Sequence, residues 1–306
     1  MTTPISGTQY SIAHGDYTAT VASIGASLRT LSHAGHDLTV PFSADELRPR
    51  YRGATLAPWP NRVIDGKYTF DGTEHQLPLT EPDRGNALHG LASWIEFVPV
   101  AKSDDSVTLA GVIEPQAGYP WRVLLSVENT LSDAGLATTV TATNLSESSA
   151  PYGTGPHPYL VAGPGRVDEW TLELPAATVL EVTADRLVPT GTRDVASAGL
   201  DWREPRLIGD TFIDHAFCDI TRDEVGFASV RLTTSDGSGV AVSWGAELPW
   251  VQVHTADQPV ATENRIGLAV EPMTCPPDAF NSGTDLIVLQ PGASSSASWV
   301  INAISG

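Results

Sequence analysis

The chain has 306 residues, of which 17 are Lys or Arg and 36 are Asp or Glu, and its formal net charge is −19. This charge argues against a nucleic-acid-binding protein, because phosphates would be repelled and no basic stripe is present to release counterions. An anionic membrane surface is an unfavourable partner for the same reason. Hydrophobic residues make up 41% of the chain, and 27 Gly and 23 Pro residues predict a folded protein with many turns.

Cysteine usage and hydropathy favour a soluble intracellular protein. The chain has two cysteines, Cys218 and Cys275, which argues against a disulfide framework. The first residues contain neither a basic region nor an apolar run, and no stretch reaches the roughly 18 apolar residues of a membrane span. We therefore expect a cytoplasmic protein without a membrane partner, present as a monomer or a weak dimer.

Alternation of apolar and polar residues with a period of two dominates the chain and predicts strands. In chain order, the predicted strands cover residues 17–24, 123–127, 135–143, 170–174, 240–244, 251–255, 285–290 and 297–301. Helical signals are few: residues 43–47 place a cap-like Ser before acids and predict a short helix or 3₁₀ turn that Pro49 soon ends. Without a linker or an internal repeat, residues 1–306 are predicted to form a single all-β domain. We expect a large antiparallel β-sandwich with very little helix and a concave face for a ligand.

Two segments in the first third of the chain differ from ordinary strands. In residues 56–62, two prolines stiffen a loop that carries Trp59 and Arg62, which suits a rigid binding wall. In residues 85–90, His89 stands between Leu and Gly and is a candidate donor to a ligand. Taken alone, each segment is also typical of a surface turn.

Three later segments place titratable side chains in unusual surroundings. His157 stands between two prolines that lock its main chain, which would hold the imidazole accurately in place. Asp214 precedes a His within an otherwise apolar stretch. Glu271 ends an apolar strand before a Pro-rich loop, where loss of solvent would raise its pKa and make it a stronger base. Each of these also fits a strained turn, a solvated turn or an edge strand.

The five segments keep one order along the chain and together resemble the aldose 1-epimerase family, the galactose mutarotases. The matching landmarks are Pro-Trp-Pro-Asn-Arg at 58–62, Ala-Leu-His-Gly at 87–90, Gly-Pro-His-Pro-Tyr at 155–159, Ile-Asp-His at 213–215, and Val-Glu-Pro-Met-Thr with Pro-Asp-Ala-Phe-Asn within 270–281. The resemblance runs across most of the chain and is closer to a divergent bacterial branch than to the best-studied galactose enzymes. It implies a galactose mutarotase-like supersandwich, a monosaccharide such as glucose or galactose as the ligand, and no metal or organic cofactor.

The resemblance also implies roles for individual residues. His157 matches the family's general acid, and Glu271 matches its general base. The residues that match the sugar-binding positions are Asn61, Arg62, His89 and Asp214, with a looser match at Gln252 in the cleft lining.

Anomer exchange explains why such a pair is needed. The C1 hydroxyl must lose a proton while the ring oxygen gains one, which calls for one base and one acid. We expect a nearby acid to raise the pKa of His157 toward the working pH. We also expect Trp59, or another aromatic residue, to stack on the C–H face of the sugar.

Three alternatives remain open at this stage. A non-catalytic carbohydrate-binding sandwich would keep Arg62 and Asp214 without a working acid and base. A glycoside hydrolase would pair Glu271 with Asp214 as two carboxylates. A mutarotase of an anionic sugar, phosphorylated or sulfonated, would use the arginines at 48, 50 and 52, which also fit a solvated surface.

Overall fold

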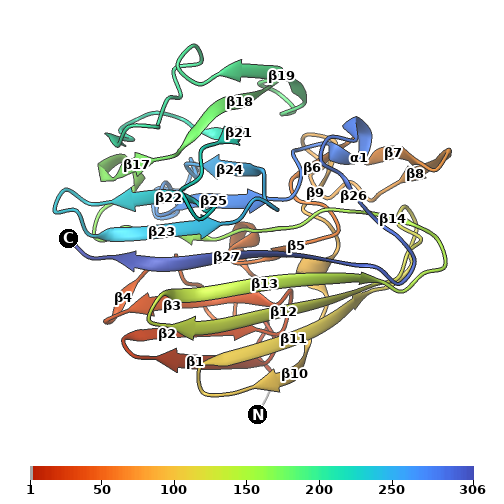
Figure 1. Cartoon of the computed structure of the whole chain (residues 1–306), viewed down its shortest axis with the longest axis horizontal. Helices are drawn as coiled ribbons and strands as arrows, with labels where there is room; N and C mark the ends of the chain where they lie inside the picture. The colour runs from red at the N-terminus through yellow and green to blue at the C-terminus, as the bar shows by residue number, and fades with distance from the viewer. Residues whose placement is uncertain (1–2) are drawn as a thin grey trace.

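A computed structural model describes residues 3–306, and its regular structure consists almost entirely of antiparallel strands (Figure 1). The largest sheet has nine strands in the order β10-β11-β12-β13-β27-β23-β22-β17-β20. In that order they are Val98–Lys102, Ser106–Ile113, Val123–Ser132, Gly135–Asn144, Ser294–Ile304, Gly239–Trp244, Ala228–Thr233, Thr171–Glu173 and Arg206–Leu207. Strand β27 pairs with both β13 and β23, so the end of the chain joins the two halves of this sheet.

The long strands of this sheet alternate between buried and more exposed residues. β11 buries every second residue from Val107 to Ile113, and β12 and β13 largely continue the same pattern. The inward residues, among them Leu109, Val127 and Val140, belong to the main hydrophobic core. Because residues two apart share a face of a strand, one face of the sheet is apolar and covers the core.

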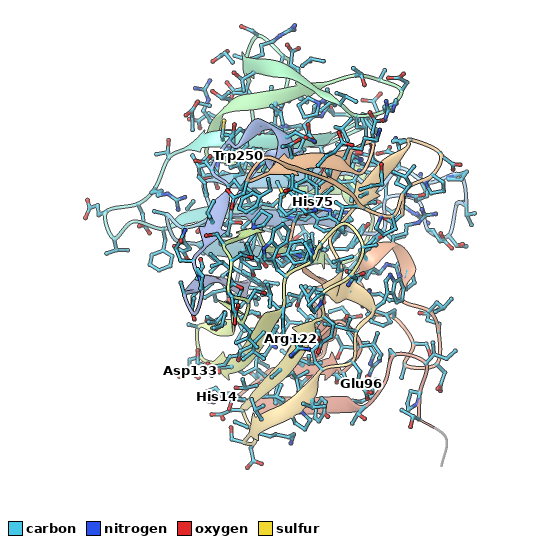
Figure 2. The ribbon with its side chains drawn as sticks, turned by 90° about the vertical axis from the view of Figure 1, so that its right-hand side faces the viewer. His14, His75, Glu96, Arg122, Asp133 and Trp250 are labelled. Carbon is cyan, nitrogen blue, oxygen red and sulfur yellow. The ribbon has the colours of Figure 1, made fainter. Side chains whose placement is uncertain are left out.

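A four-stranded sheet packs against one half of the nine-stranded sheet. It consists of β1 (Gln9–His14), β2 (Tyr17–Ala22), β3 (Ser27–His33) and β4 (His36–Asp37), in that order. β1 and β2 contact β11 and β12, as the lower part of Figure 1 shows. At the edge of this contact, His14 Nε2 lies 3.1 Å from Oδ1 of Asp133, which belongs to the turn between β12 and β13 (Figure 2).

A six-stranded sheet contributes its apolar face to the same core. Its strands, in the order β16-β25-β24-β21-β18-β19, are Tyr159–Leu160, Leu268–Met273, Trp250–His254, Asp214–Ile220, Ala176–Val182 and Pro189–Asp194. All six residues of β25 are buried. Leu268 and Val270 belong to the main core, whereas Ala269 and Met273 belong to small clusters on the other face. That second face of β25 carries Glu271.

Short ladders and helical turns complete the structure, and Figure 1 places β6 to β9 and α1 together beside the six-stranded sheet. The ladders are β5 (Thr55–Leu56) with β15 (Gly155–Pro156), β6 (Arg62–Ile64) with β9 (Asn86–Leu88), β7 (Lys67–Phe70) with β8 (Thr73–Gln76), and β14 (Ala150–Tyr152) with β26 (Ile287–Leu289). The helical turns are η1 (Pro49–Tyr51), η2 (Ala92–Trp94), η3 (Val167–Glu169) and α1 (Ala279–Ser282).

The predicted fold class is confirmed, since antiparallel sheets pack face to face and helix is scarce. Each of the eight predicted strands is confirmed, with ends that differ by a few residues. The helical signal at residues 43–47 corresponds to a single turn and no helix, and the Glu46 N–H donates to the Ser43 carbonyl oxygen at 3.4 Å. Ser43 Oγ accepts the Asp45 N–H and the Glu46 carboxylate accepts the Ser43 N–H, which closes a turn. The short segment η1 begins at Pro49 and departs from helix geometry, since Arg50 and Tyr51 have φ of +48° and +60°.

Across residues 3–306, the structure has no helix with the length and apolar character that a membrane crossing requires.

Close packing around Gly53 predicts that replacing this glycine lowers the stability of the protein measurably. The φ of Gly53 is +64°, and an added Cβ would lie 2.0 Å from the Leu28 carbonyl oxygen, whereas Gly72, with φ +76°, has no atom within 4 Å of that position. Both residues share the backbone cost of a left-handed conformation. We expect Gly53→Ala to lose about 1–3 kcal/mol more unfolding free energy than Gly72→Ala, because only Gly53 is sterically blocked. Thermal unfolding of both variants measures this; equal melting temperatures would contradict the close packing.

Candidate active site

Strand register gathers four polar side chains on one face of the six-stranded sheet. Glu271 of β25 pairs directly with Gln252 of β24, and His254 of β24 pairs directly with Asp214 of β21. Directly paired residues in antiparallel strands point to the same face, as do residues two apart along one strand. These groups therefore lie together on the face opposite the main core.

His157 reaches the same face from the segment just before β16. Its main-chain N–H donates to the Ala54 carbonyl oxygen at 3.1 Å. Its imidazole stacks on the rings of Tyr159 and Tyr51, with centroid distances of 5.1 and 6.3 Å. The residue is 5% exposed, and its Nε2 lies 3.4 Å from Oε1 of Glu271. The two groups predicted as acid and base are therefore in contact.

Asn61 and His89 form part of the opposite wall, and each has a left-handed backbone, with φ of +55° and +60°. The Asn61 N–H donates to Nδ1 of His89 at 3.2 Å, and the His89 N–H donates to the Asn61 carbonyl oxygen at 2.8 Å. Gly90 follows, where an added Cβ would lie only 2.1 Å from the Ala57 carbonyl oxygen. Glycine at 90 thus permits the close approach that places His89.

The hydrogen bond from Asn61 determines the tautomer of His89. Because Nδ1 accepts a hydrogen bond, the neutral imidazole carries its proton on Nε2 and offers an N–H there. Burial lowers the pKa of His89 well below its ordinary value, and the nearby His157 and Arg62 lower it further. His89 is therefore an uncharged hydrogen-bond donor.

The same tautomer bears on metal binding. His89, His157 and Glu271 have potential ligand atoms within 4.8 Å of one another, so these three residues are the candidates for holding a metal ion. A metal needs a nitrogen lone pair, but Nδ1 of His89 already accepts the Asn61 N–H and Nε2 then carries a proton. This hydrogen bond therefore disfavours a metal site built from all three residues and favours proton transfer as the role of the site.

Arg62 and Asp214 are held by neighbours at the sides of the site. Arg62 Nη1 donates to Oδ1 of Asn61 at 3.2 Å. Gln252 Nε2 donates to Oδ1 of Asp214 at 2.7 Å, which orients that carboxylate as an acceptor. Charged acceptors and directed donors of this kind suit the hydroxyl groups of a sugar.

These groups line one cavity of about 360 Å³, a volume within the range of small-molecule sites. Seven of the eight predicted site residues line it, namely Asn61, Arg62, His89, His157, Asp214, Gln252 and Glu271. Other lining residues, to which the sequence analysis gave no role, are Tyr51, Glu81, Arg84, Leu88, Tyr159, Phe212, His254, Asp257 and Gln258. Leu88 and Tyr159 belong to the motifs at 87–90 and 155–159, and Phe212 directly precedes the motif at 213–215, whereas Glu81 and Arg84 lie outside the motifs.

Several buried polar atoms in this cavity have no protein partner within residues 3–306. They are Nδ1 of His157, Oε1 of Gln252, Nδ1 of His254 and Oε2 of Glu271, all in residues that line the cavity. A buried polar group without a hydrogen bond is costly, and native proteins rarely leave one unsatisfied. Their convergence on one cavity favours a ligand rich in hydroxyl groups.

The prediction that Trp59 stacks on a sugar is wrong. Trp59 is 2% exposed, belongs to the main core and packs edge-on against Phe280, with ring centroids 5.5 Å apart. The prolines around it direct the ring inward, and it is absent from the cavity lining. An aromatic side chain at the cavity is Phe212, which is 53% exposed and lies two residues before Asp214.

The three arginines at 48, 50 and 52 have different environments. Arg48 is buried, donates to Ser27 Oγ and lies over the Trp94 ring; burial lowers its pKa to about 10. Arg52 lies over the Tyr159 ring. Arg50 lines the cavity, and its side chain is 42% exposed. The residues therefore do not form one basic cluster.

Burial controls the titration of His157 and Glu271 in opposite directions. Loss of solvent lowers the pKa of His157 to about 3, and the charge of His254 adds to this. Loss of solvent raises the pKa of Glu271 well above 4.5, and the negative charge of Asp214 adds to this. The expectation that a nearby acid raises the pKa of His157 is wrong, because desolvation is the largest influence and lowers it. Burial thus favours the neutral form of both groups.

Comparisons with known proteins agree with this fold. The family model described as aldose 1-epimerase matches residues 8–302. YihR of Escherichia coli K12 is 36% identical over 288 residues, which cover 94% of this chain and 90% of YihR. Galactose mutarotase of Rattus norvegicus is 29% identical over 182 residues, which cover 55% of this chain and 52% of that protein.

Solved structures show the same fold. The GalM/aldose epimerase homologue from C. elegans superposes with a TM-score of 0.84 at 22% identity, covering 97% of this chain and 99% of that chain. The family model and the likeness to YihR both extend over most of the chain, and they identify its family. The chain belongs to the aldose 1-epimerase family.

Proposed function

We propose that the protein is a cofactor-free aldose 1-epimerase, a mutarotase that interconverts the α and β anomers of a free hexose. The observation that carries this proposal is the 3.4 Å contact between Nε2 of His157 and Oε1 of Glu271 in the buried part of a sugar-sized cavity. Ring opening needs a base and an acid close to C1 and the ring oxygen, and a His–Glu pair supplies both.

In the proposed reaction, the Glu271 carboxylate takes the proton of the C1 hydroxyl while the His157 imidazolium gives a proton to the ring oxygen. The C1–O5 bond breaks, its electron pair stays on O5, and C1 becomes an aldehyde carbon. Rotation about C1–C2 presents the other face of the aldehyde, and closure reverses both proton transfers. The starting arrangement differs from the neutral pair only by one proton moved from Glu271 to His157 across their contact.

The walls of the cavity supply binding and charge stabilisation. The N–H of neutral His89 and the guanidinium of Arg62 act as directed donors where negative charge develops on oxygen. Asp214, held by Gln252, accepts hydrogen bonds from sugar hydroxyls. Phe212 covers the apolar C–H face of the sugar in the role expected of Trp59.

The charges around the cavity favour a neutral aldose. The lining contains the three arginines Arg50, Arg62 and Arg84 and the three carboxylates Glu81, Asp214 and Asp257, besides Glu271, whose neutral form burial favours. Arg62 and Arg84 both pair with Glu81, so neither is free for a phosphate. The contacts of the two carboxyl groups disfavour a two-carboxylate glycosidase, because Gln252 donates to Asp214 and Glu271 contacts an imidazole.

An anionic sugar is the second candidate, and Arg50 favours it. Its guanidinium belongs to the lining and is half exposed, and its pair with Glu263, at 3.3 Å, is also solvent-accessible and therefore weak. A phosphate or sulfonate at C6 of the sugar would compete with Glu263 for Arg50.

NMR exchange spectroscopy between anomer signals tests both candidates directly. Glucose, galactose, glucose 6-phosphate and a 6-sulfonated glucose are compared at equal concentration with and without the protein. Faster exchange of a neutral sugar supports the first candidate, and faster exchange of the anionic sugars alone supports the second. Binding of a sugar without faster exchange of any of them would overturn the mutarotase proposal in favour of a binding protein.

Loss of either member of the pair is expected to abolish most of the activity. Positioned proton transfer contributes about 10²–10⁴-fold, so His157→Ala and Glu271→Gln should each reduce kcat by that factor. This corresponds to about 3–5 kcal/mol of barrier. His36→Ala, at an exposed position away from the cavity, is the control. Exchange rates unchanged in both pair variants, with circular dichroism showing folded protein, would refute the assigned roles.

The raised pKa of Glu271 predicts how stability depends on pH. Above pH 4.5 the unfolded chain releases this proton while the folded protein retains it, so the unfolding free energy falls as pH rises. Glu271→Gln removes the ionisable group, and with it this loss of unfolding free energy at high pH. We expect the variant to exceed the wild type by about 0.5–2 kcal/mol at pH 8 and by less at pH 5, measured by denaturant unfolding.

The exposed Glu114 provides the matching control for this prediction. Its side chain is 60% exposed, so Glu114→Gln should show no comparable gain at pH 8. A stability difference between Glu271→Gln and wild type that is the same at both pH values would contradict burial of the carboxyl group in its protonated form.

A further inference from the structure

Glu81 lines the cavity next to Arg62 and forms a two-point contact with it. Arg62 Nε donates to Oε2 of Glu81 at 2.8 Å, and Arg62 Nη2 donates to Oε1 at 2.9 Å. The two side chains are 10% and 12% exposed, so this pair is largely removed from water. Bidentate pairs of this kind fix the plane of the guanidinium as well as its position.

Glu81 is in turn fixed by its own loop. Arg84 Nη1 donates to Oε1 at 3.0 Å, and Asn86 Nδ2 donates to Oε2 at 3.2 Å. The main chains of Glu81 and Asn86 also exchange hydrogen bonds in both directions. Burial alone would raise the pKa of Glu81, but the hydrogen bonds and charge of Arg62, with Asn86 and Arg84, lower it overall. The carboxylate is thus ionised and has little freedom to turn.

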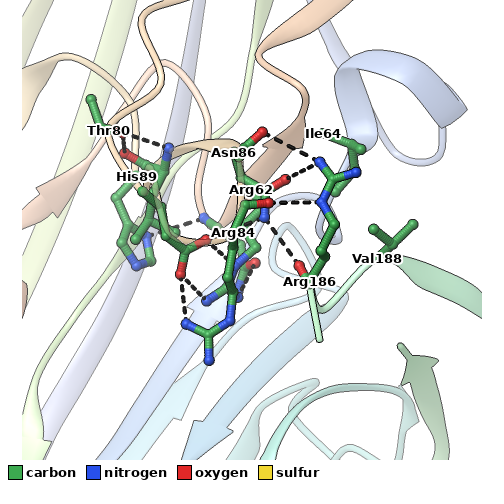
Figure 3. A network of polar contacts seen from close by, with 12 residues as sticks. Arg62, Ile64, Thr80, Arg84, Asn86, His89, Arg186 and Val188 are labelled. Atoms are coloured by element: carbon green, nitrogen blue, oxygen red, sulfur yellow. Dashed lines mark hydrogen bonds and ion pairs between the residues drawn. The ribbon is translucent and has the colours of Figure 1, made fainter. Parts of the chain in front are cut away.

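A side chain distant in sequence forms further hydrogen bonds with this loop. Arg186, in the turn between β18 and β19, donates through Nε to the Arg84 carbonyl oxygen at 2.8 Å and pairs with Asp65. Asn86 Nδ2 donates to the Arg186 carbonyl oxygen at 3.0 Å. Figure 3 shows Arg186 and Asn86 side by side with Arg62 and Arg84 in one polar network. The network therefore continues from the β18–β19 turn to the cavity.

The contacts of Arg62 determine what it can offer a ligand. A guanidinium has five N–H groups, and here three of them bond to Glu81 and Asn61. Two N–H groups remain, and the charge is compensated by Glu81. Arg62 thus presents directed donors with little net attraction for an anion.

We propose that Glu81 is a positioning residue, which aims Arg62 at the sugar and balances its charge so that the site binds a neutral hydroxylated ring. This inference rests on the proposed function for its kinetic part. Arg186 and Asn86 hold Glu81 in the required orientation, so the β18–β19 turn becomes part of the binding apparatus. Without the Glu81 carboxylate, Arg62 turns away from the sugar and becomes available to anions.

Glu81→Gln tests this inference, because it keeps the shape of the side chain and replaces one acceptor with a donor facing the guanidinium. Loss of an outer partner of a functional group typically costs about 10–100-fold. We expect KM for the sugar to rise about tenfold or more, with a smaller change in kcat. Inhibition by inorganic phosphate should become stronger. Glu114→Gln, which breaks the exposed 2.7 Å pair with Arg122, is the matched control and should leave both parameters unchanged.

A double-mutant cycle separates positioning from a purely structural role. If Glu81 acts through Arg62, Glu81→Gln should change kcat/KM by less than about twofold in an Arg62→Ala background. Independent, multiplicative effects of the two substitutions would overturn the proposal, as would a Glu81→Gln variant with wild-type KM.

Hydrogen exchange at Arg62 provides a test that needs neither activity nor a folded Glu81 variant. In ¹⁵N-arginine-labelled wild-type protein, the Arg62 Nε–H signal is identified by its loss in Arg62→Lys. The proposal expects slow solvent exchange of this proton because it is bonded to a buried carboxylate. Rapid exchange would overturn the positioning role, even if the protein proves to be an active mutarotase. Slow exchange without any anomer exchange would instead overturn the proposed function alone.

Discussion

The contact between His157 and Glu271 is the interaction on which the rest of the site depends. Both groups are almost fully buried, and burial disfavours the charged form of each. Removing them from solvent lowers the pKa of His157 and raises that of Glu271, which favours a neutral imidazole beside a protonated carboxyl group. An acid and a base that share a proton at this distance suit a reaction in which one oxygen gains a proton while another loses one.

Burying two ionisable groups costs free energy, and the surrounding strands and hydrogen bonds hold the pair in place. β25 is buried on both faces, and Glu271 is anchored by a strand whose Leu268 and Val270 pack into the main core. His157 is fixed by main-chain hydrogen bonds to the segment before β5 and by the Tyr159 ring. The rigidity of the sandwich thus offsets the desolvation of two ionisable groups, a common relation between stability and function at catalytic sites.

The opposite wall solves a different physical problem, which is to recognise an uncharged ring. His89 is a neutral donor because a main-chain N–H occupies its Nδ1. Arg62 carries a charge that Glu81 compensates, and Asp214 carries one that Gln252 orients. Directed hydrogen bonds select hydroxyl positions, whereas unpaired charges would mainly attract anions. In this arrangement the strongly acidic surface of the chain does not oppose entry of a neutral sugar.

The sequence by itself determined the fold class and seven of the residues that line the cavity. Period-two alternation is a local property of each strand, so β2, β12 and β27 could be predicted without knowing their partners. His157 and Glu271 could be named because proline-rich flanks and an apolar strand end are visible in the chain.

Tertiary structure alone decided which of these residues meet, and in what ionisation state. Trp59 was misjudged because the direction of a side chain on a proline-rich loop depends on the core beneath it. Glu81 and Arg186 were missed because their contacts with Arg62 and Arg84 join segments that are separate in sequence. Phe212 was missed because only the fold shows that its side chain lines the cavity. The pKa of His157 likewise depends on solvent exclusion by several strands, a quantity that no local pattern of residues contains.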